Sequence, residues 1–203
     1  MSKKTQNPWF SIWRYPEKTI SRLVSSKNYK QVNLITALIG LSLTLSFITF
    51  FDDFGIVIKS KYLAILLACI FGALGSVLYV KLGGYILSRL GLLFHGSAKP
   101  DQVVLAIVWS SVPLIFAIPF WLPVTYLELF FDDIQNPVFL ITITSIAIIF
   151  NSIGRVLHLL SFAYLGRMLA AVHHISKWKS FIVTCLGALI IGIPLLLAYL
   201  FIG

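Results

Sequence analysis

The sequence contains little charge and few acids for its length. Charged residues make up 11% of its 203 residues and hydrophobic residues 59%, with only seven Asp and Glu, whereas about a quarter of a soluble domain is charged. The mean hydropathy is +0.94. Because a soluble core cannot bury so much apolar surface, the composition excludes an ordinary soluble domain and predicts a single membrane domain.

Cysteine is also scarce. The two cysteines, Cys69 and Cys185, lie inside apolar runs and lack CxxC spacing. This placement is typical of apolar packing, and it excludes a disulfide framework and a cysteine-based metal motif.

Residue groups that would support catalysis within the membrane are missing from the sequence. Such chemistry needs paired acids, a serine beside a base, or metal-ligand spacing inside an apolar run. The sequence therefore predicts a protein that is not an enzyme and that needs no cofactor or metal. The four histidines lack a cysteine or a carboxylate pair and are interpreted as interfacial polar anchors: His95, His158, His173 and His174.

Five apolar runs are long enough to cross a bilayer as helices, which takes about 20 residues. The second and fourth runs continue in helix-compatible sequence beyond their spans. The predicted fold is an all-α polytopic membrane protein, with five transmembrane helices in one bundle over residues 32–203. The predicted spans are Val32–Phe51, Tyr62–Val80, Val103–Leu127, Pro137–Ile153 and Phe181–Ile202.

Prolines interrupt the third run. Pro113, Pro119 and Pro123 each lack a backbone N–H and clash with the preceding turn. We therefore predict a kinked or broken third helix. The carbonyls that it frees must be met in lipid by hydroxyls such as those of Ser110 and Ser111, by another helix, or by water.

Lysine and arginine are distributed unevenly between the two sides of the predicted spans. Fourteen of the sixteen lie on the side of the N-terminus, while five of the seven acids lie opposite, including Asp52–Asp53 and Asp132–Asp133, interpreted as solvated helix ends. Because basic loops stay in the cytoplasm, the bias predicts a cell-membrane protein with a cytoplasmic N-terminus and an outer C-terminus. The net charge of +9 then favours anionic lipids, and not nucleic acid, as partners.

Residues 1–31 are predicted to form a cytoplasmic amphipathic segment that lies at the membrane interface. Asn7 can cap a short helix that begins at Pro8, and a second helix is predicted from Pro16. Indole rings suit the interface, and basic side chains suit lipid phosphates. The alternative is a disordered basic tail. The candidate anchor residues are Trp9, Trp13, Lys18 and Arg22.

Small residues recur at a spacing of four on two predicted spans. This spacing lets helices approach closely in lipid, either within one chain or between chains. A homo-oligomer is therefore an open alternative. The candidate helix-packing residues are Ala68, Gly72 and Ser76 on the second span, and Ala188 and Gly192 on the fifth.

The order of these features resembles the Yip1 domain family, in particular its bacterial members. The segment NPWFSIWRYPEKTISRLV stands before five closely spaced spans, and GGYILSRLGLLFHGSAKPDQVVLAIVWSSVPLIF and HLLSFAYLGRMLAAVHHISKWKSFIVTCLGALIIGIPLL resemble later parts of that family. The resemblance implies a five-span bundle with a cytoplasmic N-terminus. Eukaryotic members carry a Tyr-Gly-Pro element and are linked to Rab GTPases, but this chain reads SSKNYKQVN before the first span and departs from that pattern.

Two functions of different classes follow from these observations. The first is a non-enzymatic scaffold or accessory subunit for other membrane proteins, including a transport system, since some bacterial relatives sit beside such systems. The second is a small transporter or channel that uses the proline-broken third span, because unwound backbone can build a substrate site. An enzyme of lipid metabolism that uses His173 or His174 is a third, weaker alternative.

Overall fold

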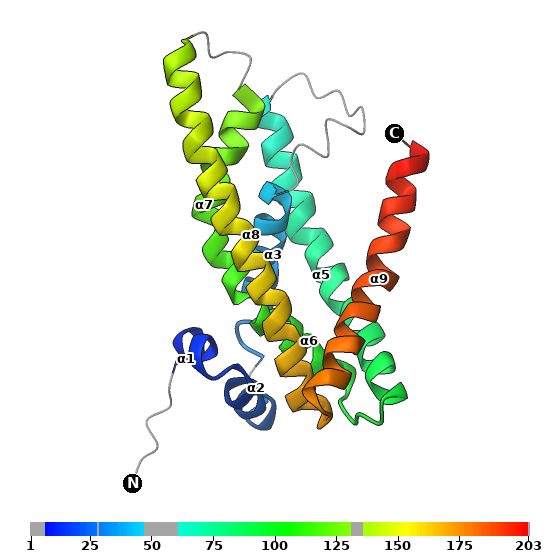
Figure 1. The fold of residues 1–203 in the computed structure, drawn as a ribbon. Helices are drawn as coiled ribbons and strands as arrows, with labels where there is room; N and C mark the ends of the chain where they lie inside the picture. Colours follow the sequence, from blue (N-terminus) through cyan, green and yellow to red (C-terminus); the bar gives the residue numbers. More distant parts are fainter. Residues whose placement is uncertain (1–6, 28, 47–60, 131–135, 203) are drawn as a thin grey trace.

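The computed structural model describes residues 7–27, 29–46, 61–130 and 136–202, and in these ranges the chain folds entirely into helices and turns (Figure 1). The all-α prediction is confirmed. The helices are α1 (Pro8–Arg14), α2 (Pro16–Ser25), α3 (Val32–Ser46), α5 (Lys61–Leu93), α6 (Pro100–Ser110), α7 (Val112–Phe130), α8 (Pro137–His173) and α9 (Lys177–Ile202).

Four stretches of the described chain are long and apolar enough to cross a membrane. A fifth apolar helix, α3, covers 15 residues and ends at Ser46, and the rest of the predicted first span lies outside the described residues, as do both predicted acidic pairs. The membrane fold is therefore confirmed, while the count of five spans stays a prediction. The four stretches are Ile65–Leu93, Pro100–Leu127, Pro137–His173 and Lys177–Pro194.

The third predicted span is broken, as its prolines indicated. Helix α6 ends at Ser110 and α7 begins at Val112, so that Ser111 separates them. Pro113 occupies the second position of α7, where a missing N–H costs nothing, and its ring would clash with the turn of a continuous helix. Pro119 and Pro123 lie inside α7.

Helices α5 and α8 are longer than a bilayer is thick. They contain 33 and 37 residues, which correspond to about 50 and 55 Å against a hydrocarbon core of about 30 Å. Asn136 begins α8 by accepting hydrogen bonds from the N–H groups of Val138 and Phe139 at 3.0 and 3.1 Å. Both helices extend beyond their apolar spans, as the sequence predicted.

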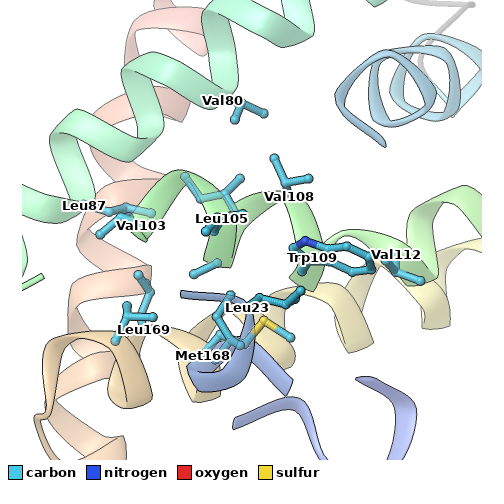
Figure 2. Close-up of a cluster of buried hydrophobic side chains, with 14 of the residues drawn as sticks. Leu23, Val80, Leu87, Val103, Leu105, Val108, Trp109, Val112, Met168 and Leu169 are labelled. Atoms are coloured by element: carbon cyan, nitrogen blue, oxygen red, sulfur yellow. The ribbon is translucent and has the colours of Figure 1, made fainter. Parts of the chain in front are cut away.

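The main hydrophobic core lies toward one end of the bundle, which we call the lower end. It is the end in Figure 1 where α1, α2, the α5–α6 turn and the α8–α9 turn lie. Figure 2 shows part of this core, in which Leu23 of α2 meets Leu105 and Trp109 of α6 and Met168 of α8. Ile12 and Ile20 are fully buried in it as well, so α1 and α2 belong to the folded bundle.

Candidate functional site

The N-terminal helices form where the sequence placed them. The side chain of Asn7 accepts a hydrogen bond from the N–H of Trp9 at 3.1 Å, and Pro8 begins α1. Tyr15 separates the two helices, and Pro16 begins α2. Because each proline lacks an N–H that a first turn would leave unpaired anyway, both starts cost little.

Trp9 is turned toward the bundle. Its Nε1 donates a hydrogen bond to Gln31 Oε1 at 2.9 Å, and its ring meets that of Trp109 edge-on, with centroids 5.7 Å apart. The ring is half-buried by these contacts. The contacts do not test a lipid anchor, which stays a prediction for Trp9.

Trp13, one turn after Trp9, also packs against aromatic rings of the bundle. Its ring lies edge-on to Phe116 of α7 and Tyr164 of α8, with centroids 5.3 and 6.5 Å away. The hydroxyl of Tyr164 donates a hydrogen bond to the backbone carbonyl of Trp13 at 2.9 Å. Trp13 therefore links α1 to α7 and α8 close to the break in the third span.

The two candidate cations of α2 lie in different surroundings. Lys18 is exposed, and its Nζ lies over the ring of Tyr15 at 5.5 Å from the centroid. Arg22 is half-buried and donates to the hydroxyl of Ser11 at 3.3 Å, and that hydroxyl also lies 2.9 Å from Thr19 Oγ1. Both cations remain candidates for lipid phosphate.

Glu17 ties α2 to the α8–α9 turn, a contact that the sequence did not predict. Its Oε1 lies 3.0 Å from Arg167 Nε and 3.1 Å from Lys177 Nζ. The hydrogen bond from Arg167 lowers the pKa of Glu17, and Lys177 acts in the same direction. Residues 17 and 167 belong to separate apolar patterns, so no local signal in the sequence could have paired them.

Hydroxyl groups supply hydrogen bonds around the break in the third span. Ser110 and Ser111 both donate to the carbonyl of Ile107, at 2.9 and 2.8 Å. From α3, the hydroxyl of Ser42 donates to the carbonyl of Leu114 at 2.6 Å. The serines that the sequence singled out therefore lie at the break, and a neighbouring helix adds a further donor.

The candidate kink residues differ in their surroundings. Pro113 is buried at the start of α7, Pro123 is half-buried, and Pro119 is exposed. Near the middle of α7, the indole of Trp121 packs over Gly154 of α8, where an added Cβ would approach the ring to 2.6 Å. Small residues on α8 thus let α7 pack closely despite its prolines.

The small residues of the second span face α3. A Cβ on Gly72 would lie 2.9 Å from the carbonyl oxygen of Gly40 and would collide with the hydroxyl of Thr44. The hydroxyl of Ser76 lies 2.8 Å from the carbonyl of Thr36. Gly72 and Ser76 therefore lie in the α3–α5 contact, while Ala68 precedes Gly72 by one turn on α5.

The small residues of the fifth span lie elsewhere. Ala188 and Gly192 line a cleft of about 270 Å³ between α5, α8 and α9, together with Tyr79 and Phe162. A Cβ on Gly192 would meet nothing within 4 Å. The two sets of candidate packing residues are thus not brought together, and the second set borders open space.

The histidines lie mostly at the turns of the lower end. His95 and His174 adopt left-handed backbone conformations at the ends of α5 and α8. His173 is buried, and its Nδ1 accepts a hydrogen bond from the N–H of Ala98 at 3.3 Å. His158 lies higher on α8, beside Trp121. Over the ranges that the structure describes, no three His, Cys, Asp or Glu side chains gather into a metal-binding group.

The described chain is a bundle of helices, and four stretches of it are long and apolar enough to cross a membrane. These features define an all-α membrane protein. Within that class, residues 10–199 match the Yip1 domain, so the chain belongs to the Yip1 domain family, which confirms the resemblance seen in the sequence. No curated protein and no solved structure matches the chain.

Proposed function

We propose that the protein is a non-enzymatic scaffold or accessory subunit that binds other membrane proteins, such as the components of a transport system. The observation that carries this proposal is a contrast in burial. In the apolar part of Pro100–Leu127, 67% of the residues are buried, against 12% for Ile65–Leu93 and 11% for Pro137–His173. The third predicted span, α6 with α7, is therefore packed inside the bundle. Helices α5 and α8 carry exposed apolar surface.

The high burial of the third span favours a scaffold over a transporter. The carbonyl of Leu114 is bonded by Ser42, and the carbonyl of Leu45 accepts from Thr125 Oγ1 at 3.1 Å. These bonds join α3 to α7 next to the break and again further along α7, so α3 closes this side of the third span. Outward apolar surface on α5 and α8 is the surface that a partner helix could cover by close packing in lipid.

In the cell membrane, the lower end is proposed to face the cytoplasm, with the C-terminus outside. The support is the excess of basic residues at the lower end. To test this, Cys69 and Cys185 would be replaced by alanine, and single cysteines placed at Ser176 or Gln135. An impermeant thiol reagent should label Gln135→Cys in intact cells and Ser176→Cys only after lysis. The reverse pattern would overturn the orientation.

Photo-cross-linking in living cells tests the scaffold proposal directly. A benzophenone amino acid would replace Leu78 of α5 or Leu159 of α8, which are 70% and 72% exposed, and Leu105, which is fully buried, would serve as the matched control. We expect discrete heavier products from the two exposed sites and none from the control. Products of monomer size at all three sites, together with solute uptake by liposomes that contain only this protein, would favour the transporter.

The alternative of a small transporter or channel rests on one further observation. Trp121 Nε1 and His158 Nε2 are both buried, and neither has a hydrogen-bond partner in the described part of the chain. Their rings lie 5.7 Å apart beside the prolines of α7. Unpaired polar atoms within a membrane bundle are typical of hydrated sites. Replacing His158 with phenylalanine should abolish uptake if this site carries a substrate.

A further inference from the structure

We propose that the outward face of α1 and the start of α2 form a binding site for the headgroup of an anionic phospholipid. The site consists of Phe10, Ser11, Arg14, Tyr15 and Lys18. This inference goes beyond the scaffold function and does not depend on it. It also assigns the lipid contact to residues other than the two tryptophans.

The outward face is shaped as a hollow with an apolar rim. A depression of about 330 Å³ is lined by Asn7, Phe10, Ser11, Arg14 and Tyr15. Phe10 is 76% exposed, although Ile12 on the opposite face of the same short helix is fully buried. A large exposed aromatic side chain, on a helix held firmly in place, is suited to the boundary between headgroups and acyl chains.

One cation, Arg14, lines this hollow, and two more contact its lining residues. The guanidinium of Arg14 and the ammonium of Lys18 lie over the ring of Tyr15, at 5.3 and 5.5 Å from its centroid. Arg22 donates to the hydroxyl of Ser11, one of the residues that line the hollow. Cation–π contacts of this kind hold the two outer cations near one ring.

No carboxylate in the described ranges forms an ion pair with these three cations. Glu17 lies between Lys18 and Pro16 in sequence, but its carboxylate is committed to Arg167 and Lys177. The hollow therefore presents positive charge that no carboxylate of the described residues neutralises. A phosphate group is the complementary ligand, because arginine binds its oxygens through several parallel hydrogen bonds.

The position of α1 favours a membrane over an acidic protein as the source of that phosphate. From the inner face of α1, Trp13 contacts Phe116, which is itself 46% exposed on the apolar helix α7. Helix α1 thus lies directly beside an exposed aromatic side chain of an apolar helix. Phe10 and the cations then stand where an interfacial helix carries its aromatic and basic residues.

Collision accessibility of a spin label in the full-length protein tests this placement. In a background without Cys69 and Cys185, a nitroxide would be attached at Phe10→Cys, or at Ser97→Cys in the exposed α5–α6 turn as the aqueous control. The protein would be reconstituted in vesicles of phosphatidylcholine with one quarter phosphatidylglycerol. We expect oxygen to relax the label at position 10 several-fold more than a water-soluble nickel chelate does, and the opposite at position 97.

Two changes test whether binding needs opposite charges on the lipid and on the protein. One removes the anionic lipid from the vesicles, and the other removes two cations from the site. The preference for oxygen at position 10 should weaken in pure phosphatidylcholine, and Arg14→Gln with Lys18→Gln should weaken it in the mixed vesicles. The same preference for oxygen in mixed vesicles, in pure phosphatidylcholine and in the double variant would overturn the headgroup site. Only apolar insertion would then remain. Nickel accessibility at position 10 as high as at position 97 would overturn the whole proposal. A label immobilised in native membranes but water-exposed in vesicles would overturn it in favour of a protein partner.

Discussion

The lower end of the bundle and the outer surfaces of α5, α8 and α9 are built in different ways. At the lower end, side chains from the N-terminal helices meet those of the longer helices in one core, and polar groups such as the Glu17 carboxylate and His173 Nδ1 have protein partners. On the outer surfaces, large apolar side chains such as those of Leu78 and Leu159 are exposed. The first region fixes the shape of the protein, and the second is free to meet lipid or other proteins.

The same difference between packed and open surface separates two glycines that are three residues apart on α5. Gly72→Leu should cause the largest loss of stability, of several kcal/mol, because its Cβ would meet the backbone of Gly40 at 2.9 Å, and the backbone cannot yield cheaply. Gly75→Leu, the matched control, should be neutral or slightly stabilising, because a Cβ there meets nothing within 4 Å. Thermal unfolding in mild detergent measures both. Similar losses for the two variants would contradict the packing of α3 against α5.

A smaller effect is expected from leucine truncations in the two regions. Leu105→Ala removes a fully buried side chain from the core of Figure 2 and should cost about 2–5 kcal/mol. Leu159→Ala, at a side chain that is 72% exposed, should change detergent stability by less than about 0.5 kcal/mol. The same thermal assay compares the two. A costly Leu159→Ala would mean that this surface is covered even in detergent, and would point to a stable oligomer.

The sequence predicted the helices well because their signals are local. Apolar runs predicted the four stretches that are long enough to cross a membrane, Asn7 and Pro8 predicted the start of α1, and Pro113 predicted the break between α6 and α7. The docking of α1 and α2 could not be predicted. An apolar stripe such as Ile12 with Ile20 looks the same in sequence whether lipid or protein covers it.

The same limit applies to the candidate site. The helical spacing of Trp9, Ile12 and Trp13 places them on one face of α1 and leaves Phe10 off it, but the sequence does not say that this face meets protein, as the ring of Trp9 meets that of Trp109. Long-range pairs such as Glu17 with Arg167 depend on how the helices pack, and packing is decided by shape over the whole core rather than by any motif. The sequence thus predicted the elements, and only the structure showed what covers their apolar faces.

The ion pairs of Glu17 with Arg167 and Lys177 should contribute only modestly to the free energy of unfolding. Glu17→Gln is expected to cost at most about 1 kcal/mol, because the pair is partly exposed and screened. The lowered pKa of Glu17 means that its contribution is present above the ordinary glutamate pKa of about 4.3 and is lost as the pH falls through the lower, folded pKa. The difference in melting temperature between wild type and variant should therefore be constant near neutral pH and should close in acid. A difference that grows in acid would contradict the pairing.

The smallest effect on stability is expected at the break itself, from Pro113→Ala. The substitution restores an N–H and relieves the clash that ends α6, but it also frees the unfolded chain and removes part of a buried ring, so we expect a net change within about 1 kcal/mol of zero. The bonds from Ser42 and Ser111 stay in place and should hold the break open even without the proline. For a scaffold, the variant should therefore behave like wild type in cells, whereas a transporter that works through the break should lose activity. Thermal stability in detergent and the cellular phenotype, measured beside a deletion strain and a Pro119→Ala control, separate the two. A stable Pro113→Ala protein with the phenotype of the deletion would overturn the scaffold and place function at the break.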